Sequence, residues 1–225
     1  MDAITSVISV PPAEVLAIIP ARVGSQGIPL KNFRLLDGVS PLDRTIACAL
    51  MASCCPVVTT DSEETVAGTH WRYAGPPIHT NACSMVDVVN DVLSVYRGEP
   101  TQRILVLQPT QPLRRPSHLR QALALLAQYP SVASVVEVEP AAKLYYEGFV
   151  PVLPDEPVEQ RQHAQPTYAC DGTVYGFLRE WFQTHQTFRH AAGTAMLIIP
   201  RDQTCRLDTL ADWRLAERIL RAPEY

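Results

Sequence analysis

The chain has 225 residues, of which 47% are hydrophobic and 19% charged, and its formal net charge is −4. This length suits one α/β domain, and the balance of residues is that of a globular rather than a disordered protein. The negative charge argues against a nucleic acid polymer as partner, and no run reaches the roughly 18 apolar residues of a membrane-spanning helix.

Short apolar runs alternate along the chain with segments that carry apolar residues at three- and four-residue spacing. The runs predict strands at Val15–Ile19, Val57–Thr60, Ile104–Leu107, Val132–Val138, Val174–Leu178 and Ala195–Ile199. The spaced segments predict helices at Leu42–Cys54, Val86–Tyr96, Leu119–Gln128 and Leu210–Leu220. Pro41 favours the start of the first helix, and Asp208 or Thr209 suits the N-cap of the last. This alternation predicts a doubly wound α/β fold with a mostly parallel sheet.

The loop after the first strand is the most informative segment, and residues 17–32 read AIIPARVGSQGIPLKN. Gly24 and Gly27 let backbone N–H groups approach a ligand closely, and such N–H groups bind anions. Arg22 and Lys31 add positive charge at the carboxyl end of a strand, where α/β sheets bind ligands. The loop therefore suggests a polyphosphate cradle. Its spacing is neither a Walker motif nor GxGxxG, and a glycine-containing turn with two solvated cations is the alternative.

Residues 139–165 interrupt the alternation with four prolines and little helical periodicity. Gly148 separates two short apolar or aromatic pieces, Leu144–Tyr146 and Phe149–Leu153, which suggests a hairpin. An excursion of this length in a compact domain is usually functional or an interaction arm, and a surface loop without a role is the alternative.

The N-terminal segment, MDAITSVISVPPAEV, lacks the basic region and the apolar core of a signal peptide. The six cysteines show neither CxxC nor Cys/His metal spacing. We expect a cytoplasmic protein whose thiols are reduced and mostly buried.

The sequence IPARVGSQGIPLKN resembles the nucleotide-binding loop of the CMP-sialic acid synthetase (acylneuraminate cytidylyltransferase) family, which is usually close to IPARGGSKGIPxKN. Five further segments resemble the family in the same order: VTTDSEE, NACSMVDVV, LQPTQPLR, RQHAQPTYACDGTVY and LDTLADWRLAERIL. The resemblance spans roughly residues 16–220. It implies a single Rossmann-like nucleotidyltransferase domain over residues 1–225, with residues 139–165 as an arm that contacts the second subunit of a homodimer.

The resemblance also implies roles for individual residues. The nucleotide would be bound by Ala21, Arg22, Gly24, Ser25, Gly27, Lys31, Asn32 and Ser84. The acceptor would be bound by Gln108, Arg161, Tyr175 and Phe188. Arg22, Lys31 and Asp208 would be catalytic, and Asp208 would hold Mg²⁺.

Several of these residues have simpler structural interpretations. Ser84 could be an ordinary helix N-cap. Asp61 follows a strand end and could contact the nucleotide, or it could be a turn residue. Arg114 could contact the ligand directly, or it could brace the LQPTQPLR loop by pairing with an acid. Tyr175 and Phe188 could be core aromatics. Asp212 suits the first turn of a helix, and Asp171 stands where the family usually has Asn.

Four residues depart from the family pattern: Val23 replaces a glycine, Gln26 a lysine, Leu30 a frequently basic residue, and Arg206 the first Asp of the metal pair. Losing one preorganised charge at a phosphoryl centre can cost roughly 3 kcal/mol, which slows a reaction roughly a hundredfold. Arg206 could itself reach the phosphates and replace the lysine that Gln26 has displaced.

The reaction that the resemblance implies is transfer of CMP from CTP to a small acidic acceptor, with release of pyrophosphate. A nonulosonic acid of the sialic type is the first expectation, and a phosphonate in antibiotic biosynthesis is the alternative. A chain that binds CTP or CMP without turnover is a third hypothesis, which Gln26 and Arg206 favour. The sequence does not identify a general base.

Overall fold

The computed structural model describes residues 15–25, 27–61, 72–74, 83–96, 102–138, 145–146, 150–151 and 166–222. Its strands are β1 (Val15–Pro20), β2 (Cys55–Thr60), β3 (Arg72–Ala74), β4 (Arg103–Val106), β5 (Ser131–Val138), β6 (Tyr145–Tyr146), β7 (Val150–Pro151), β8 (Thr167–Leu178) and β9 (Thr194–Ile198). Its helices are α1 (Pro41–Met51), α2 (Met85–Val95), α3 (Pro116–Leu125), α4 (Arg179–His185), α5 (Leu210–Leu220) and the 3-10 helix η4 (Arg201–Gln203).

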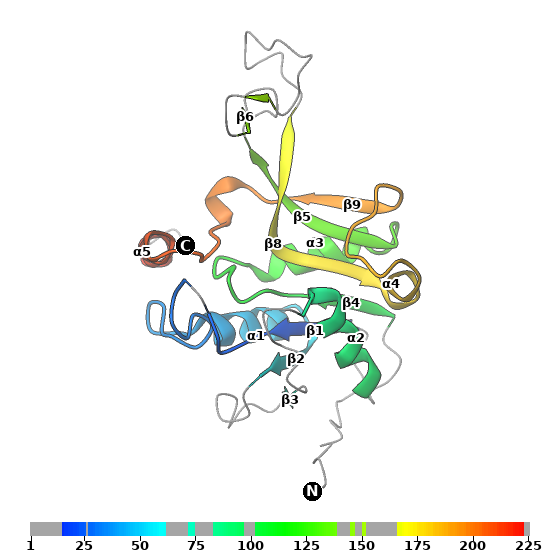
Figure 1. Ribbon diagram of the computed structural model, residues 1–225, viewed down its shortest axis with the longest axis horizontal. Coiled ribbons are helices and arrows are strands. Elements are labelled where there is room, and N and C mark those ends of the chain that lie inside the picture. Colours follow the sequence, from blue (N-terminus) through cyan, green and yellow to red (C-terminus); the bar gives the residue numbers. More distant parts are fainter. Residues whose placement is uncertain are drawn as a thin grey trace, which may run out of the picture.

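Seven of the described strands form one sheet in the order β3-β2-β1-β4-β8-β5-β9 (Figure 1). Neighbouring strands are parallel except where β8 pairs antiparallel with β4 and β5. Helices α1 and α3 pack on one face of the sheet, and α2 and α4 pack on the other. The predicted doubly wound, mostly parallel α/β fold is confirmed.

Strand β1 lies inside the sheet between β2 and β4, and its side chains alternate between two hydrophobic cores, as the twofold period of a strand requires. Ala17 and Ile19 lie in the core that α1 and α3 complete. Leu16 and Ile18 lie in the core that α2 and α4 complete. All four side chains are fully buried, so the loop that follows β1 starts from a rigid anchor.

Helix α5 packs on loops rather than on the sheet (Figure 1). Its residue Trp213 shares a third core with Ile28 from the loop after β1, Leu113 from the loop after β4, and Leu207 from the segment before α5. The guanidinium of Arg34 lies 5.3 Å from the centre of the Trp213 ring. This core holds the C-terminal segment against the carboxyl ends of β1 and β4.

Several details of the secondary structure differ from the sequence prediction, including strand β3, which was not predicted. Helix α4 was not predicted, because its seven residues are too few to show a helical period. Strand β8 starts at Thr167 rather than Val174, because its first half mixes polar and partly exposed residues. Helix α1 ends at Met51, three residues before the predicted Cys54, and Ser53 follows with a left-handed φ of 58°.

The segment 139–165 carries the short strands β6 and β7, which pair antiparallel as expected for a hairpin. The pair lies beyond the far ends of β5 and β8 (Figure 1). Contact of this segment with a second subunit stays a prediction.

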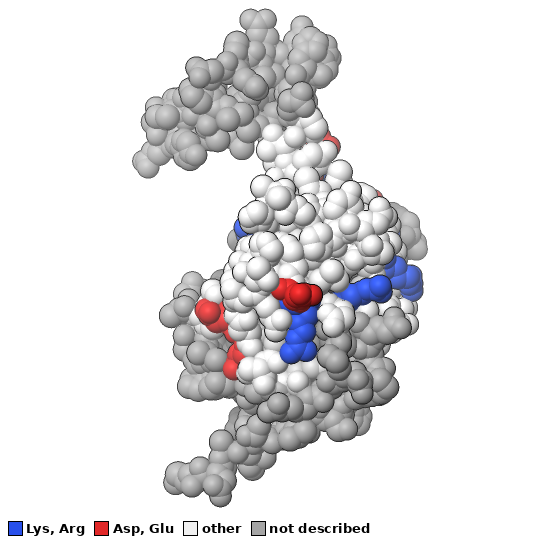
Figure 2. All heavy atoms as spheres, turned by 90° about the vertical axis from the view of Figure 1, so that its right-hand side faces the viewer, with Lys and Arg blue, Asp and Glu red and all other residues white. Residues whose placement is uncertain are grey.

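All six cysteines are free, as the sequence analysis expects. Cys48, Cys54, Cys55 and Cys205 are buried, and burial raises the pKa of each thiol to about 11. None of the helices in the described part of the chain has the length and hydrophobicity needed to span a bilayer. On the face in Figure 2, the described charged side chains form small separate groups of either sign.

Candidate active site

A cavity of about 540 Å³ opens at the carboxyl ends of the parallel strands. It is lined by the loop after β1, the end of β2, the start of α2, the loop after β4 and the segment before α5. Eight of the predicted site residues line it: Ala21, Arg22, Ser25, Gly27, Lys31, Asn32, Gln108 and Asp208. The structure thus brings most of the predicted nucleotide-binding residues together around one space.

Hydrogen bonds to β2 and the residue after it hold the start of the loop. The backbone N–H of Ala21 donates to the carbonyl of Thr59 at 2.8 Å. The backbone N–H of Val23 donates to Oδ1 of Asp61, also at 2.8 Å. Asp61 therefore acts as a brace for the loop, in keeping with its structural interpretation.

Asn32 is 95% buried at the edge of this cavity and presents an unpaired acceptor. Its Nδ2 donates to the carbonyl of Arg22 at 3.0 Å, which fixes the orientation of the side-chain amide. Its Oδ1 has no hydrogen-bond partner among the described residues. Leaving a buried acceptor unpaired costs free energy, so this oxygen is suited to accept a hydrogen bond from a bound ligand.

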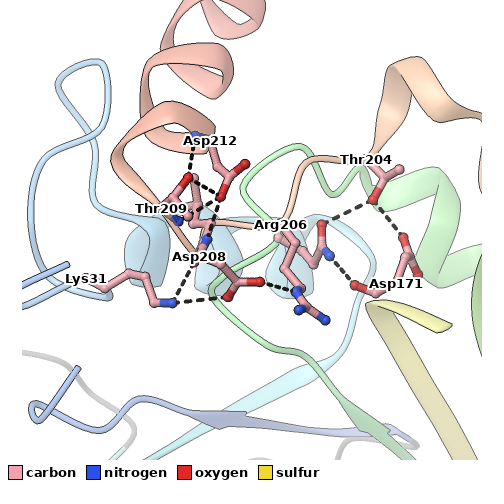
Figure 3. Close-up of polar contacts among 9 residues, drawn as sticks. Lys31, Asp171, Thr204, Arg206, Asp208, Thr209 and Asp212 are labelled. Atoms are coloured by element: carbon pink, nitrogen blue, oxygen red, sulfur yellow. Dashed lines mark hydrogen bonds and ion pairs between the residues drawn. The ribbon is translucent and has the colours of Figure 1, made fainter. Parts of the chain in front are cut away.

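Lys31, the second cation of the loop after Arg22, reaches across to the C-terminal segment (Figure 3). Its Nζ donates to the carbonyl of Leu207 at 2.5 Å and lies 3.5 Å from Oδ1 of Asp208. The second carboxylate oxygen of Asp208 accepts from Nε of Arg206 at 2.5 Å. Asp208 thus lies between two cations, one from each end of the chain.

The start of α5 fixes the backbone of Asp208. Thr209 is the N-cap, and Asp212 completes a capping box with it. Oδ2 of Asp212 also accepts from the backbone N–H of Asp208 at 3.2 Å. Burial opposes ionisation of Asp212, but the hydrogen bonds from Thr209 and Asp208 outweigh it and lower the pKa of this carboxyl group. Thr209 and Asp212 match their sequence interpretation as helix-start residues.

Gly27 allows the loop to lie directly against Asp208. A Cβ atom at position 27 would lie 2.5 Å from the backbone oxygen of Asp208, a distance that forces one of the two segments to move. We expect Gly27→Ala to lower kcat/KM for CTP about a hundredfold, because displacements of about 1 Å at a reacting centre have effects of that size. Steady-state kinetics would measure this loss.

Gly24→Ala is the matched control, because a Cβ atom at Gly24 would meet nothing within 4 Å. We expect it to lose far less activity than Gly27→Ala. Equal losses would show that both glycines act through the flexibility of the loop rather than through the approach to Asp208.

The loop after β4 is held by Arg114, whose side chain is 93% buried. Its guanidinium donates to the carbonyls of Thr173 at 2.6 Å and Gln108 at 2.5 Å, and to Oγ1 of Thr45 at 3.0 Å. Burial lowers the pKa of Arg114 to about 10. The bracing role is confirmed, but the expected pairing with an acid is wrong for the described residues, since two carbonyls and a hydroxyl accept its hydrogen bonds instead.

Asp171, which stands where the family usually has Asn, joins this loop to the C-terminal segment. Its carboxylate accepts from the backbone and hydroxyl of Thr173 and, at 2.9 Å, from the hydroxyl of Thr204. The side-chain amide of Gln111 donates to its carbonyl. The carboxylate of Asp171 therefore accepts its hydrogen bonds from residues of the fold. It lies on the side of Arg206 away from Lys31 (Figure 3).

Next to this network, His118 is 98% buried, and burial lowers the pKa of its imidazole. Its Nδ1 accepts from the backbone N–H of Arg115 at 3.3 Å, so the neutral ring carries its proton on Nε2, 3.0 Å from Oε1 of Gln203. The neighbouring guanidinium groups also lower this pKa, while Gln203 and Asp171 act to raise it.

The lowered pKa of His118 predicts a loss of stability in mild acid. The unfolded chain binds a proton at the ordinary histidine pKa of 6.5, whereas the folded chain resists it, so the free energy of unfolding falls as the pH drops below that value. Urea unfolding of the wild type and His118→Gln between about pH 8 and pH 5 would isolate this contribution. A wild-type curve that runs parallel to that of the variant would contradict the prediction.

The predicted acceptor residues are brought together only in part. Gln108 lines the cavity, and Gly172, with φ +82°, lies so close that a Cβ atom there would be 2.5 Å from its Oε1. Tyr175 and Phe188 pack against each other with ring centres 5.4 Å apart, in contact with the core of α2 and α4 rather than in the lining of the cavity. Arg161 and Gln26 lie outside the described residues.

Two predicted nucleotide-binding residues, Gly24 and Ser84, are absent from the described lining of the cavity. Ser84 is the N-cap of α2, where its Oγ accepts from the backbone N–H of Asp87. The structural interpretation of Ser84 is therefore confirmed, and a contact with nucleotide stays a prediction. The neighbouring Cys83 and Met85 line the cavity instead.

Among the lining residues that the sequence analysis did not single out are Thr59, Cys83, Met85 and Val88. Thr59 lies at the carboxyl end of β2, beside β1 in a parallel pair, so the position of that strand end was the available signal. Met85 and Val88 are three residues apart on α2 and so share one face of the helix. Their apolar side chains are suited to cover the face of a nucleobase.

The fold and this cavity can now be set beside known proteins. A family model described as cytidylyltransferase matches residues 16–147, which is more than half of the chain. The chain belongs to the cytidylyltransferase family. As a member of this family it is a CTP-dependent nucleotidyltransferase.

Two curated relatives are similar to this chain in sequence. It is 29% identical to a CMP-N,N'-diacetyllegionaminic acid synthase of Legionella pneumophila, over 92% of this chain and 96% of that one. It is also 29% identical to an N-acylneuraminate cytidylyltransferase of Streptococcus agalactiae serotype V, over 77% of this chain. The match spans 45% of that longer relative.

Two solved structures share the fold. A CMP:2-keto-3-deoxy-manno-octonic acid synthetase complexed with CTP superimposes with a TM-score of 0.70 at 15% identity, over 92% of this chain and 98% of that one. A 4-diphosphocytidyl-2C-methyl-D-erythritol synthase from Anaerococcus prevotii gives 0.64 at 11% identity, over 92% and 98%. Both confirm the nucleotidyltransferase fold that the sequence resemblance implied.

Proposed function

We propose that this cytidylyltransferase transfers CMP from CTP to a nonulosonic acid and releases pyrophosphate. The observation that carries the proposal is the single cavity in which the cations Arg22 and Lys31 lie beside the unpaired buried acceptor of Asn32. Cations suit the triphosphate, and a buried acceptor suits a hydroxyl or amino group of the nucleoside. The legionaminic acid synthase, aligned over nearly its whole length, supports an acceptor of this class.

The reaction is a displacement at the α-phosphorus, in which the acceptor hydroxyl attacks and pyrophosphate leaves. Such reactions need little covalent chemistry from the protein, so positioning and charge stabilisation supply most of the catalysis. Arg22 and Lys31 would hold the phosphates, Asn32 would orient the nucleoside, and Gln108 would face the acceptor.

Mg²⁺ is proposed as the cofactor, with Asp208 as its protein ligand. Among the described residues, Asp208 is the one carboxylate that lines the cavity, and no cluster of three or more metal-binding side chains occurs. One carboxylate is sufficient for a Mg²⁺ ion that is held mainly by substrate phosphates, so the residues fit the ion. When bound, Mg²⁺ supplies Lewis-acid polarisation of the phosphoryl oxygens.

A pyrophosphate-release assay tests this function directly. The purified chain would be incubated with Mg²⁺, each of CTP, UTP, ATP and GTP, and a panel of acceptors that includes legionaminic, sialic and Kdo-type acids and a phosphonate. We expect turnover with CTP and a nonulosonic acid. Turnover only with a phosphonate, or tight CTP binding without turnover of any acceptor, would contradict the proposal; the relatives found give no support to either alternative.

Cys83 offers an independent test of where the nucleotide lies. Its thiol is partly exposed and lines the cavity, and its Sγ lies 3.5 Å from the carbonyl of Ser84. We expect CTP to slow alkylation of Cys83 while leaving the other partly exposed thiol, Cys170, unchanged. Mass spectrometry of the labelled peptides would measure both sites in one sample.

Arg161 is proposed to pair with the carboxylate of the acceptor, since its forked guanidinium suits that group. We expect Arg161→Ala to raise the KM of the acceptor far more than that of CTP. Initial rates with each substrate varied in turn would measure the two effects, and equal effects would remove Arg161 from the acceptor site. A homodimer and a cytoplasmic location remain predictions from the sequence.

A further inference from the structure

Arg206 brings a positive charge to a position where the family resemblance leads one to expect a carboxylate. The residue lines the cavity together with Lys31 and Asp208. Its side chain is 60% exposed, so the guanidinium is accessible from the cavity rather than locked in the core. The fold does not depend on burying this group.

The orientation of the guanidinium leaves most of its donors without a partner among the described residues. Nε donates to Asp208, and the two terminal nitrogens face away from that carboxylate (Figure 3). Among the described residues, the contact through Nε is the one ion pair that Arg206 makes. An arginine presents five N–H donors in a fixed fork that matches phosphate oxygens, and Asp208 orients that fork by holding one edge of it.

Arg206 also changes the charge of the cavity. The charged side chains of the described lining are Arg22, Lys31 and Arg206 against the single carboxylate of Asp208, so their net charge is +2. With an aspartate at position 206 it would be zero, and a triphosphate would then rely on metal ions for neutralisation. The cavity therefore contains within its own side chains part of the positive charge that a divalent ion would otherwise bring.

We propose that Arg206 binds the phosphate tail of CTP and reduces the need for a divalent cation in CTP binding. This rests on the proposed function, since it assumes that CTP occupies the cavity. Lys31 and Arg206 lie on either side of Asp208, and the carbonyl of the intervening Leu207 holds the Lys31 amine. The two cations therefore form a pair that can contact neighbouring phosphates, with Asp208 as the positioning residue between them.

Calorimetric titration with CTP and with CMP, each in EDTA and in Mg²⁺, tests this proposal. The variants are Arg206→Gln, which removes the charge, Arg206→Lys, which keeps it, and Arg206→Asp, which restores the carboxylate of the family. In EDTA we expect Arg206→Gln to weaken CTP binding roughly tenfold or more, which is the usual effect of losing a hydrogen bond to a charged group. We expect the same variant to change CMP binding little. We expect a smaller loss for Arg206→Lys.

Arg206→Asp gives the sharpest outcome. We expect it to lose the most affinity for CTP in EDTA and to recover the most when Mg²⁺ is added. Arg201→Gln is the matched control, because Arg201 is an exposed arginine of the same segment that donates to the carbonyl of Glu137 and does not line the cavity. Arg201→Gln removes one positive charge, as Arg206→Gln does, and we expect it to leave the affinities for CTP and for CMP unchanged.

The outcomes separate this inference from the proposed function. If the wild type binds CTP but Arg206→Gln binds CTP and CMP as the wild type does, the role of Arg206 is overturned and the cytidylyltransferase function stands. If Arg206→Gln weakens CTP and CMP equally, Arg206 serves only to position Asp208, and the inference is also overturned. If the wild type binds neither nucleotide, both proposals fail.

Discussion

Replacing Arg114 with methionine is expected to lower the free energy of unfolding by about 3 kcal/mol, the usual size of the loss when one partner of a buried charged network is removed. Methionine keeps much of the side-chain volume but donates no hydrogen bond. The carbonyls of Thr173 and Gln108 would then be left without the guanidinium that now satisfies them. Urea unfolding followed by circular dichroism would measure the change.

Arg120→Met is the control for this variant. Arg120 lies on α3, close in sequence to Arg114, but it is exposed and donates one hydrogen bond, to the carbonyl of Met51 at 3.1 Å. We expect a loss below about 1 kcal/mol, as for most exposed substitutions. Arg114→Met and Arg120→Met with equal stabilities would show that the buried network contributes nothing beyond packing.

Lys31→Met is expected to lower kcat/KM for CTP about a hundredfold to a thousandfold, the range seen when one preorganised charge is removed from a reacting centre. Lys31 is the cation that joins the loop after β1 to the C-terminal segment, and its side chain is only 15% exposed. Pyrophosphate release at varied CTP concentration would measure the loss. A variant with unchanged kinetics would remove Lys31 from the catalytic machinery.

A labelling experiment would test the same prediction without a substitution. The chain contains two lysines, Lys31 and Lys143. We expect CTP to protect Lys31 from acetylation by an amine-directed reagent and to leave Lys143 unprotected, so that one residue serves as the internal control for the other. Equal protection of both lysines, or of neither, would contradict a contact between Lys31 and the phosphates.

Local signals in the sequence were sufficient for the loop and most of the sheet. The apolar run of β1 and the glycines and cations after it predicted a ligand-binding loop, and six residues of that loop line the cavity together with Pro20. The hairpin β6–β7 and the capping of α5 also follow from local patterns. Such features depend on residues a few positions apart, which a single sequence contains.

Long-range contacts could not be read in the same way. Two of the three hydrogen-bond acceptors of Arg114 are backbone carbonyl oxygens, and because every residue has a carbonyl, no residue type in the sequence indicates which ones these are. The antiparallel direction of β8 depends on how the chain returns to the sheet rather than on its composition. The sequence shows that Arg206 departs from the family pattern. Only the structure shows that its guanidinium donates a hydrogen bond to Asp208.

The hydrogen bond from Lys31 to the carbonyl of Leu207 joins residues separated by 176 positions. A ribosome makes the lysine early and its partner only after nearly the whole domain has been synthesised. A growing chain therefore has the loop after β1 long before it has the segment that completes the cavity. The cavity is complete only once the segment before α5, with Arg206 and Asp208, has been synthesised.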